Sequence, residues 1–231
     1  MCGRYSLEWD VDELARHFGL VVRQMPRLEP RYNIAPSQPI AIVHDNRDRD
    51  ERRMTLVQWG LVPFWADDPS IGQRMINARS ETAATKPAYK AAMKYRRCVV
   101  PASGFYEWQA QPSGKQPHYF HPTADEPLAL AGLYEHWTGP DGEEIDTGTI
   151  LTTQANAAVK PIHDRMPVIL RLDDVPRWLD AGEQDPAAVT DLLQPAPDDL
   201  LTRHAVSKRI NRPGPDDPSL IDPIQTDGEL F

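Results

Sequence analysis

Cysteine is scarce in this sequence, and the signals of export and membrane insertion are missing. The 231 residues include two cysteines, Cys2 and Cys98, which are too few for a disulfide framework and lack the spacing of a zinc motif. We therefore expect a reducing, cytoplasmic environment. No apolar run reaches the ~18 residues of a membrane span, and the N-terminus lacks the basic and apolar regions of a signal peptide. These absences exclude a secreted disulfide scaffold, and we expect no membrane partner.

Positively charged residues are also outnumbered by acidic ones in the whole chain. The formal net charge of −9 argues against a general nucleic-acid binder. The charge is unevenly spread, because residues 71–97 carry seven Lys and Arg against one acid, whereas residues 172–231 carry five against thirteen. A basic segment of this kind can bind a phosphate backbone locally. A solvated helix face explains the same segment equally well.

The common catalytic motifs are absent too. The sequence has no glycine-rich phosphate loop, no HExxH zinc motif and no GxSxG nucleophile motif. His118 and His121 stand three residues apart, but in an expected strand they point to opposite faces of the sheet. That arrangement does not suit a shared metal ion. We expect neither a metal nor a cofactor.

The order of apolar, turn and capping residues predicts an α+β fold. An amphipathic helix is expected over residues 9–20, with Asp10 and Glu13 at its start and Gly19 at its end. Further helices are expected at Ser80, over residues 87–95, after Asp174 and after Asp185. Strands are expected over residues 39–44, 54–59, 98–108, 118–121, 128–137, 147–153, 168–172 and 204–210. This pattern predicts a single domain with a mainly antiparallel, strongly curved, barrel-like sheet flanked by short helices.

The first two residues carry the most unusual chemistry. An initiator Met followed by a small residue such as Cys2 is normally removed after synthesis, and we expect no leader that would prevent this. Removal leaves a free amine and a thiol on one residue, and this 1,2-aminothiol reacts with aldehydes. The amine condenses to a Schiff base, and the thiol closes onto the imine carbon to form a thiazolidine. An α-amine pKa of about 7.7–8.0 leaves a useful neutral fraction near pH 7. Two residues alone still favour the plainer interpretation, which is an idle chain end.

Four polar residues elsewhere are candidates for chemistry or binding. Glu107 stands among aromatic residues in an apolar strand, where burial would raise the pKa of its carboxyl and suit it to proton transfer. A solvent-facing strand glutamate is the plainer interpretation. His163 lies between prolines and can shuttle a proton or bond to the backbone. Asn77 and Arg79 can hold an oxygen and a phosphate, or they can serve as a helix cap and a surface residue.

The loop over residues 60–65 is unusually aromatic. Such residues most often pack the loop itself. Their functional interpretation is a platform on which bases stack.

Six short motifs occur in the order found in one known family. They are residues 2–4, 31–36, 59–60, 76–82, 104–108 and 162–167. Together they resemble the SOS-response-associated peptidase (SRAP) family, whose members are also called abasic-site processing proteins. No single motif is decisive, but six in the right order are specific. The resemblance implies one SRAP-like domain over residues 2–224 and a C-terminal tail over residues 225–231.

The resemblance implies a sensor of abasic sites in single-stranded DNA. An abasic deoxyribose equilibrates with a ring-opened aldehyde, which is the natural target of an aminothiol. By motif, Cys2 would form a covalent thiazolidine crosslink that protects the lesion, and Glu107 would position or deprotonate its amine. His163 would pass a proton to the opened sugar oxygen and help to reverse the adduct. Asn77 would hold the sugar.

The resemblance also implies a set of DNA contacts. They are Arg4, Asn33, Pro36, Trp65, Arg79, Trp108 and Arg165. Arg4 and Arg79 would hold flanking phosphates, and the proline and the tryptophans would wedge or stack against bases. Some relatives carry adjacent tryptophans where this chain has Pro63-Phe64-Trp65, so the wedge is the part of the resemblance that the sequence supports least.

Two other function classes stay open from the sequence. One is an N-terminal nucleophile peptidase or amidase, in which the thiol of Cys2 attacks a carbonyl carbon. The other is a non-catalytic module for single-stranded DNA. The peptidase label of the family implies that Met1 leaves by autoproteolysis, and a housekeeping aminopeptidase would serve equally. We expect a monomer that acts in the cytoplasm on single-stranded DNA containing abasic sites.

Overall fold

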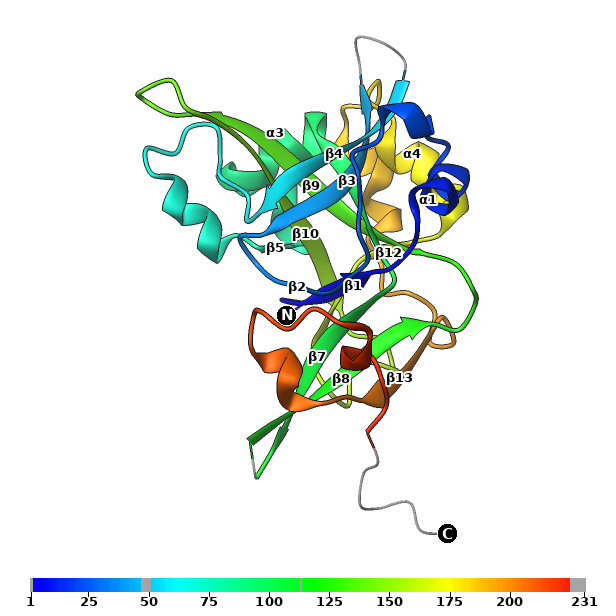
Figure 1. The fold of residues 1–231 in the computed structure, drawn as a ribbon. Coiled ribbons are helices and arrows are strands. Elements are labelled where there is room, and N and C mark those ends of the chain that lie inside the picture. Colours follow the sequence, from blue (N-terminus) through cyan, green and yellow to red (C-terminus); the bar gives the residue numbers. More distant parts are fainter. Residues whose placement is uncertain (1, 47–50, 113, 225–231) are drawn as a thin grey trace.

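A computed structural model describes residues 2–46, 51–112 and 114–224 (Figure 1). The strands are β1 (Tyr5–Leu7), β2 (Arg31–Ile34), β3 (Pro39–Asn46), β4 (Glu51–Trp59), β5 (Asn77–Arg79), β6 (Arg97–Ala102), β7 (Gly104–Gln111), β8 (Gly114–Pro122), β9 (Leu128–Thr138), β10 (Glu144–Gln154), β11 (Arg165–Pro167), β12 (Ile169–Leu170) and β13 (Leu201–Ala205). The α-helices are α1 (Val11–Phe18), α2 (Ser80–Ala83), α3 (Pro87–Tyr95) and α4 (Val175–Leu179). The 3₁₀-helices are η1 (Val22–Gln24), η2 (Pro69–Arg74), η3 (Leu172–Asp174), η4 (Pro186–Leu192), η5 (Lys208–Asn211) and η6 (Pro218–Leu220).

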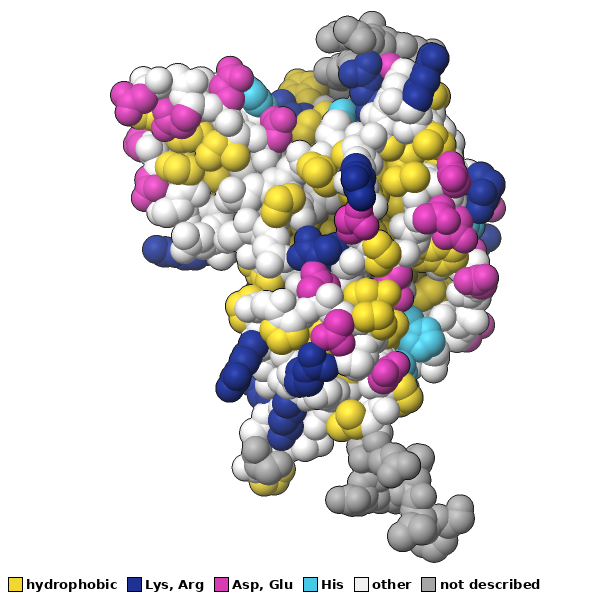
Figure 2. Space-filling model, in the orientation of Figure 1, with side chains coloured by type: hydrophobic (Ala, Val, Ile, Leu, Met, Phe, Trp, Pro, Cys, Tyr) yellow, Lys and Arg dark blue, Asp and Glu magenta, His cyan; other side chains and the backbone are white. Residues whose placement is uncertain are grey.

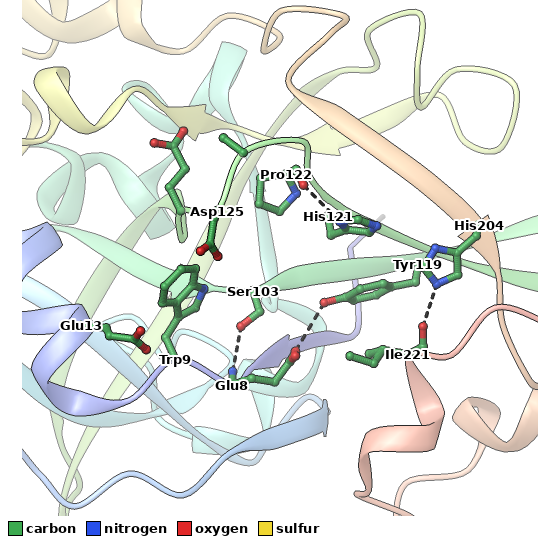
Figure 3. A pocket seen from close by; sticks show the side chains of 12 residues that line it. Glu8, Trp9, Glu13, Ser103, Tyr119, His121, Pro122, Asp125, His204 and Ile221 are labelled. Atoms are coloured by element: carbon green, nitrogen blue, oxygen red, sulfur yellow. Dashed lines mark hydrogen bonds between the residues drawn. The ribbon is translucent and has the colours of Figure 1, made fainter.

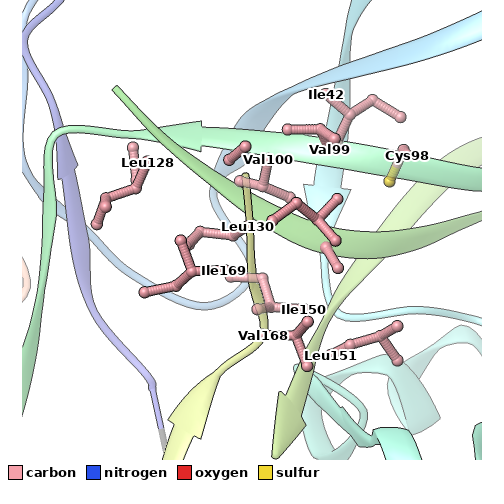
Figure 4. Packing of buried hydrophobic residues seen from close by; sticks show 14 of the residues in the cluster. Ile42, Cys98, Val99, Val100, Leu128, Leu130, Ile150, Leu151, Val168 and Ile169 are labelled. Atoms are coloured by element: carbon pink, nitrogen blue, oxygen red, sulfur yellow. The ribbon is translucent and has the colours of Figure 1, made fainter. Parts of the chain in front are cut away.

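The larger sheet closes on itself. β3 pairs with β4 and β6, β6 pairs with β9, β9 pairs with β10, and β10 pairs with β4. Of these pairings, the one between β10 and β4 is parallel and the others are antiparallel. Closure leaves these strands without a free edge, and the core contains fully buried residues such as Val100, Leu130 and Ile150 (Figure 4). The expected α+β fold with a curved, barrel-like, mainly antiparallel sheet is confirmed.

A second, open sheet lies below the barrel in Figure 1. Its strand order is β13–β8–β7–β1–β2, and all of its pairings are antiparallel. Successive side chains of β7 face opposite sides of this sheet. Phe105 belongs to the main core, whereas Tyr106 belongs to a second cluster with Tyr119 and Ile210. The sheet therefore separates the main core from C-terminal residues that cover its other face.

Helix α1 follows from its capping residues. Asp10 accepts a hydrogen bond from the backbone of Glu13, and the Glu13 side chain accepts one from the backbone of Asp10. This reciprocal pair satisfies two of the free N–H groups of the first turn. Gly19 ends the helix in the left-handed conformation that a residue without Cβ adopts freely. Leu14 and Phe18 are buried on one face, so the predicted helix is confirmed with slightly shorter bounds.

Two expected strands are interrupted or shortened in the structure. The stretch over residues 98–108 becomes β6 and β7, because Ser103 turns the chain from the barrel into the second sheet. The backbone N–H of Ser103 donates a 2.8 Å hydrogen bond to the carbonyl oxygen of Ser6 in β1. The strand expected over residues 168–172 is shortened to β12, because the chain turns into η3 at Leu172.

Two other local predictions are wrong. The strand expected over residues 204–210 ends at Ala205, and the following residues form η5, where the hydroxyl of Ser207 accepts a backbone hydrogen bond. Ser80 does not cap α2. It is the first helical residue, and Arg79 occupies the capping position without a side-chain bond.

The remaining helix predictions are partly correct. The helix expected over residues 87–95 is confirmed with the same bounds. Asp185 caps η4 through the backbone N–H of Ala187, but this element is a 3₁₀-helix. Asp174 precedes α4 without a side-chain cap.

In the described residues, no helix is long and apolar enough to cross a membrane. The same residues contain no group of three or more His, Cys, Asp or Glu side chains placed to hold a metal ion. The tail predicted over residues 225–231 lies outside the described residues.

Candidate active site

Cys2 lies just before β1 and is fully buried. Its carbonyl oxygen accepts a 2.8 Å hydrogen bond from Nδ2 of Asn77. Asn77 opens β5, which is aligned by parallel pairing with Ile150 of β10. Oδ1 of the same amide is buried and has no hydrogen-bond partner among the described residues. Asn77 therefore holds the backbone of Cys2 and retains an acceptor for another group.

Glu107 lies on the main-core face of β7. It is 2% exposed, so the interpretation as a solvent-facing strand glutamate is wrong. Burial raises the pKa of the Glu107 carboxyl, and the nearby His163 lowers this pKa by a smaller amount. The negative charge of Glu107 in turn raises the pKa of the Cys2 thiol. The structure thus brings together all four residues that the resemblance implies for the chemistry.

The thiol of Cys2 is held in its neutral form. Burial, reinforced by the negative charge of Glu107, raises the pKa of this thiol to about 12. A thiol with such a pKa is protonated near neutral pH, and the thiolate is the form that attacks carbonyl carbons.

His163 stands in the loop that leads into β11. Its Nδ1 accepts a 2.9 Å hydrogen bond from the backbone N–H of Arg165. In a neutral imidazole one ring nitrogen accepts while the other carries the proton. The backbone bond therefore places the proton on Nε2, so the two interpretations of this residue are compatible: it bonds to the backbone and keeps a proton to transfer.

Arg165 is fixed by a two-point ion pair with Glu81. Its Nη1 and Nη2 lie 2.5 Å and 2.9 Å from the two carboxylate oxygens of Glu81, and Nη2 also donates to the carbonyl oxygen of Thr152. This contact with Arg165 lowers the pKa of the Glu81 carboxyl. Arg79, at the end of β5, is exposed and makes no ion pair in the described part of the chain. Of the two arginines, Arg79 has the freer guanidinium.

Arg4 and Asn33 are engaged in internal hydrogen bonds. Nη1 of Arg4 donates to Oδ1 of Asn33 and, at 2.7 Å, to the carbonyl oxygen of Ile210. Asn33 is 2% exposed, and its Nδ2 donates to the carbonyl oxygens of Arg212 and Pro215. Both residues hold the C-terminal segment against β1 and β2.

The aromatic candidates are more accessible. Phe64 and Trp65 are 56% and 49% exposed, so this loop does not bury its own aromatic rings. Trp108 is half-buried on the Tyr106 face of β7, opposite Glu107, and its Nε1 donates a 2.6 Å hydrogen bond to Oδ1 of Asn211. The half-buried Pro36 precedes a turn residue with positive φ.

Sequence reasoning missed the residues that meet this surface from the C-terminus. They are Lys208, Asn211 and Arg212. Their short basic run was hidden in a segment with a strongly negative total charge. Only the fold brings it beside Arg4 and Trp108.

A separate cavity of about 460 Å³ lies next to Trp9 and Tyr119 (Figure 3). Neither Cys2 nor any of Asn77, Glu107 and His163 lines it. It is lined by the carboxylates of Glu8, Glu13, Asp125 and Glu126. A lining rich in carboxylates would repel phosphate.

Comparison with known proteins gives consistent results. A family model described as SOS response associated peptidase (SRAP) matches residues 1–213. Abasic site processing protein YoqW of Bacillus subtilis (strain 168) is 39% identical over 225 residues, which cover 96% of this chain and 99% of that protein. Abasic site processing protein HMCES of Gallus gallus is 35% identical over 265 residues, which cover 97% of this chain and 78% of that protein.

Solved structures are similar over most of the chain. A crystal structure of a protein from Bacteroides thetaiotaomicron has a TM-score of 0.87 at 24% identity and covers 97% of this chain and 100% of that one. A crystal structure of a protein from Bordetella bronchiseptica has a TM-score of 0.76 at 27% identity and covers 89% of this chain and 100% of that one. At 24% identity, the similarity to the Bacteroides thetaiotaomicron protein supports the fold alone.

Proposed function

Because this chain belongs to the SOS response associated peptidase (SRAP) family, we propose that it captures abasic sites in single-stranded DNA through the amine and thiol of Cys2. Curated relatives at 39% and 35% identity are abasic site processing proteins, which supports abasic DNA as the target. The proposal requires that Met1 be removed, by the protein itself or by an aminopeptidase. The captured lesion would then be shielded during replication or repair.

The reaction balances without a cofactor. The amine nitrogen of Cys2 adds to the aldehyde carbon of the ring-opened sugar, and loss of one water gives an imine. The thiol sulfur then bonds to the imine carbon, and the thiol proton ends on the ring nitrogen. The product is a thiazolidine that joins the protein to DNA, and the net by-product is one water molecule.

Each neighbouring residue has a part in this sequence. The Glu107 carboxylate takes a proton from the ammonium form of Cys2, since an amine is nucleophilic only when neutral. His163 supplies the proton that the opened sugar oxygen needs, and its transfer in reverse assists release. Asn77 holds the Cys2 backbone through Nδ2 and offers Oδ1 to a sugar hydroxyl.

One observation carries the proposal. The Asn77 amide, the Cys2 backbone, the Glu107 carboxylate and the His163 ring form one cluster, although they come from four separate segments of the chain. Cys2 and Glu107 are buried in it, and Asn77 and His163 are half-buried. A peptidase that attacks through sulfur is a weaker fit, because burial keeps the Cys2 thiol protonated.

A denaturing gel tests the proposal. Protein with a free Cys2 amine is incubated with a single-stranded oligonucleotide that carries one abasic site, then heated. We expect a heat-stable shifted band whose mass equals protein plus DNA minus one water. Reversible binding without this band would support a non-catalytic DNA module, and cleavage of peptide substrates without it would support the peptidase.

A further inference from the structure

The segment over residues 207–220 contains η5 and η6 and covers the outer face of the second sheet, beneath the N-terminus in Figure 1. We propose that this segment, here named the C-terminal strap, binds phosphates of the DNA that flanks the captured lesion, through Lys208 and Arg212. The inference rests on the proposed function and extends it from the abasic sugar to the neighbouring nucleotides.

The strap is anchored on the surface that the resemblance implies for DNA. Nη1 of Arg4 donates a 2.7 Å hydrogen bond to the carbonyl oxygen of Ile210. Nε1 of Trp108 donates a 2.6 Å bond to Oδ1 of Asn211. Nδ2 of Asn33 donates to the carbonyl oxygen of Arg212, the next residue of the strap. Consecutive strap residues are thus tied to three expected DNA contacts.

The strap is also packed in advance of binding. Ile210 and Leu220 are fully buried in the second cluster with Tyr106. Little further ordering is therefore needed when a strand arrives, which lowers the entropic cost of binding.

The strap's two clustered acids are already engaged. The carboxylate of Asp216 pairs with Arg31 and accepts hydrogen bonds from two backbone N–H groups of β2. The carboxylate of Asp217 lies 2.7 Å from Nη2 of Arg209 and accepts from the hydroxyl of Ser219. These internal partners reduce the repulsion that the acids would exert on a phosphate.

Two cations remain available. Lys208 and Arg212 are exposed, and neither makes an ion pair within residues 2–46, 51–112 and 114–224. Figure 2 shows Lys and Arg side chains gathered over this part of the molecule. A DNA strand would therefore meet unpaired positive charge here, even though the whole chain carries a net charge of −9.

The geometry of η5 places one cation on the same helix face as a residue that contacts an aromatic ring. In a 3₁₀-helix the side chains at i and i+3 lie one above the other. Lys208 therefore shares a face with Asn211, whose side chain contacts the half-buried Trp108. Single-stranded DNA sites combine cations with stacking rings along one groove.

The strap is close to the reacting residue. Arg4, which holds Ile210, is two residues from Cys2, so their Cα atoms are at most about 7 Å apart. A strand joined to Cys2 that runs toward Arg4 would reach the strap within a few nucleotides, on one side of the lesion.

Fluorescence anisotropy tests this inference with an oligonucleotide carrying a tetrahydrofuran abasic analogue, which has no aldehyde and reports reversible binding. We compare the wild type with Lys208→Ala/Arg212→Ala and with a charge-matched control, Arg16→Ala/Arg23→Ala, which removes exposed cations from α1 and η1. The slope of log affinity against log salt should become shallower by about 1.4 in the strap variant, or about 0.7 for each lost phosphate contact. The control should keep the wild-type slope.

Two further arms locate the contact and separate it from the chemistry. With DNA trimmed on the 5′ side or the 3′ side of the lesion, the difference between the wild type and the strap variant should vanish for one trimmed strand and persist for the other. At saturating abasic DNA, the strap variant should reach the wild-type crosslink yield. An unchanged salt slope, or an equal loss in the Arg16→Ala/Arg23→Ala control, would overturn the inference. If the wild type formed no crosslink, the proposed function would fail. The anisotropy measurements would still test whether the strap binds DNA phosphates.

Discussion

The side-chain amide of Asn77 donates a 2.8 Å hydrogen bond to the carbonyl oxygen of Cys2, across 75 positions of sequence. The bond fixes the residue that carries both reactive groups. Oδ1 of the same amide is buried without a partner in the described part of the chain. An unpaired buried acceptor is costly, and a sugar hydroxyl would satisfy it.

Replacing Asn77 by Ala should slow covalent capture by about 5-fold, since one hydrogen bond contributes about 1 kcal/mol and every 1.4 kcal/mol is a factor of ten. Asn77→Asp should slow capture at least as much, because it removes the donor and directs a carboxylate at the Cys2 carbonyl. Single-turnover crosslinking gives the rates, and anisotropy on undamaged single-stranded DNA gives the control. A wild-type capture rate in Asn77→Ala would show that the bond has no part in the reaction.

Glu107 should leave a distinct mark on the pH dependence of capture. Because Glu107 itself takes the ammonium proton, capture requires the ammonium and the carboxylate together. The rate should therefore change little between the pKa of Glu107 and the amine pKa of about 7.7–8.0, and it should fall tenfold per pH unit below the pKa of Glu107. Since burial raises this pKa, the fall should begin above the ordinary value for Glu of about 4.3.

The matched variant for this prediction is Glu107→Gln, which keeps the shape and cannot titrate. Its rate should be lower near neutral pH, where general-base contributions are typically about 10²–10⁴-fold. Without a carboxylate the variant depends on the neutral amine, so its rate should fall tenfold per pH unit from the amine pKa of about 7.7–8.0 downward. A pH profile in Glu107→Gln that matches the wild type would assign the titration to another group.

Gly60 supports the site through a close approach of two backbones. A Cβ at Gly60 would lie 2.5 Å from the carbonyl oxygen of Gly72, and φ at Gly60 is +127°. The preceding Trp59 donates from Nε1 to the carbonyl oxygen of Ile76, next to Asn77. Gly60→Ala should therefore lower the free energy of unfolding by at least about 2 kcal/mol, from backbone strain and overpacking together.

Gly142→Ala is the control for Gly60→Ala. Gly142 also has positive φ, at +84°, but a Cβ there would meet nothing within 4 Å. Gly142→Ala should lower the free energy of unfolding by only about 1 kcal/mol. Urea unfolding with comparison of midpoints and slopes measures both variants, and equal losses would mean that the contact with Gly72 is not the cause.

Local sequence signals predicted much of the secondary structure. Asp10, Glu13 and Gly19 mark the ends of α1, and the bounds of α3 follow from Pro87 and the last periodic residue. These signals act within one or two turns of a helix, so they can be interpreted without knowing the rest of the fold.

The misses come from contacts between distant segments. The apolar run over residues 98–108 is continuous in sequence, and its break at Ser103 depends on a bond to Ser6 in another strand. Arg4 was expected to hold a flanking phosphate, whereas its guanidinium also holds the carbonyl oxygen of Ile210, 206 positions away. No local pattern encodes such a pair.

Cys2 and the three residues near it, Asn77, Glu107 and His163, were selected through the resemblance and not through spacing. On its own, the stretch around Glu107 favours an exposed strand residue. Its burial at 2% exposure depends on how β7 lies between two clusters. The sequence could therefore nominate the residues, and the fold was needed to bring them together.

The central claim is that the free amine of Cys2 begins the reaction. With a residue still attached before Cys2, its nitrogen is a planar amide and cannot form an imine. The direct measurement is intact mass followed by crosslinking yield on abasic single-stranded DNA, for protein that begins at Cys2 and for protein with an uncleavable N-terminal extension. We predict a heat-stable crosslink from the first and none from the second, with equal reversible binding to DNA. Equal crosslink yields from both proteins would contradict the aminothiol mechanism.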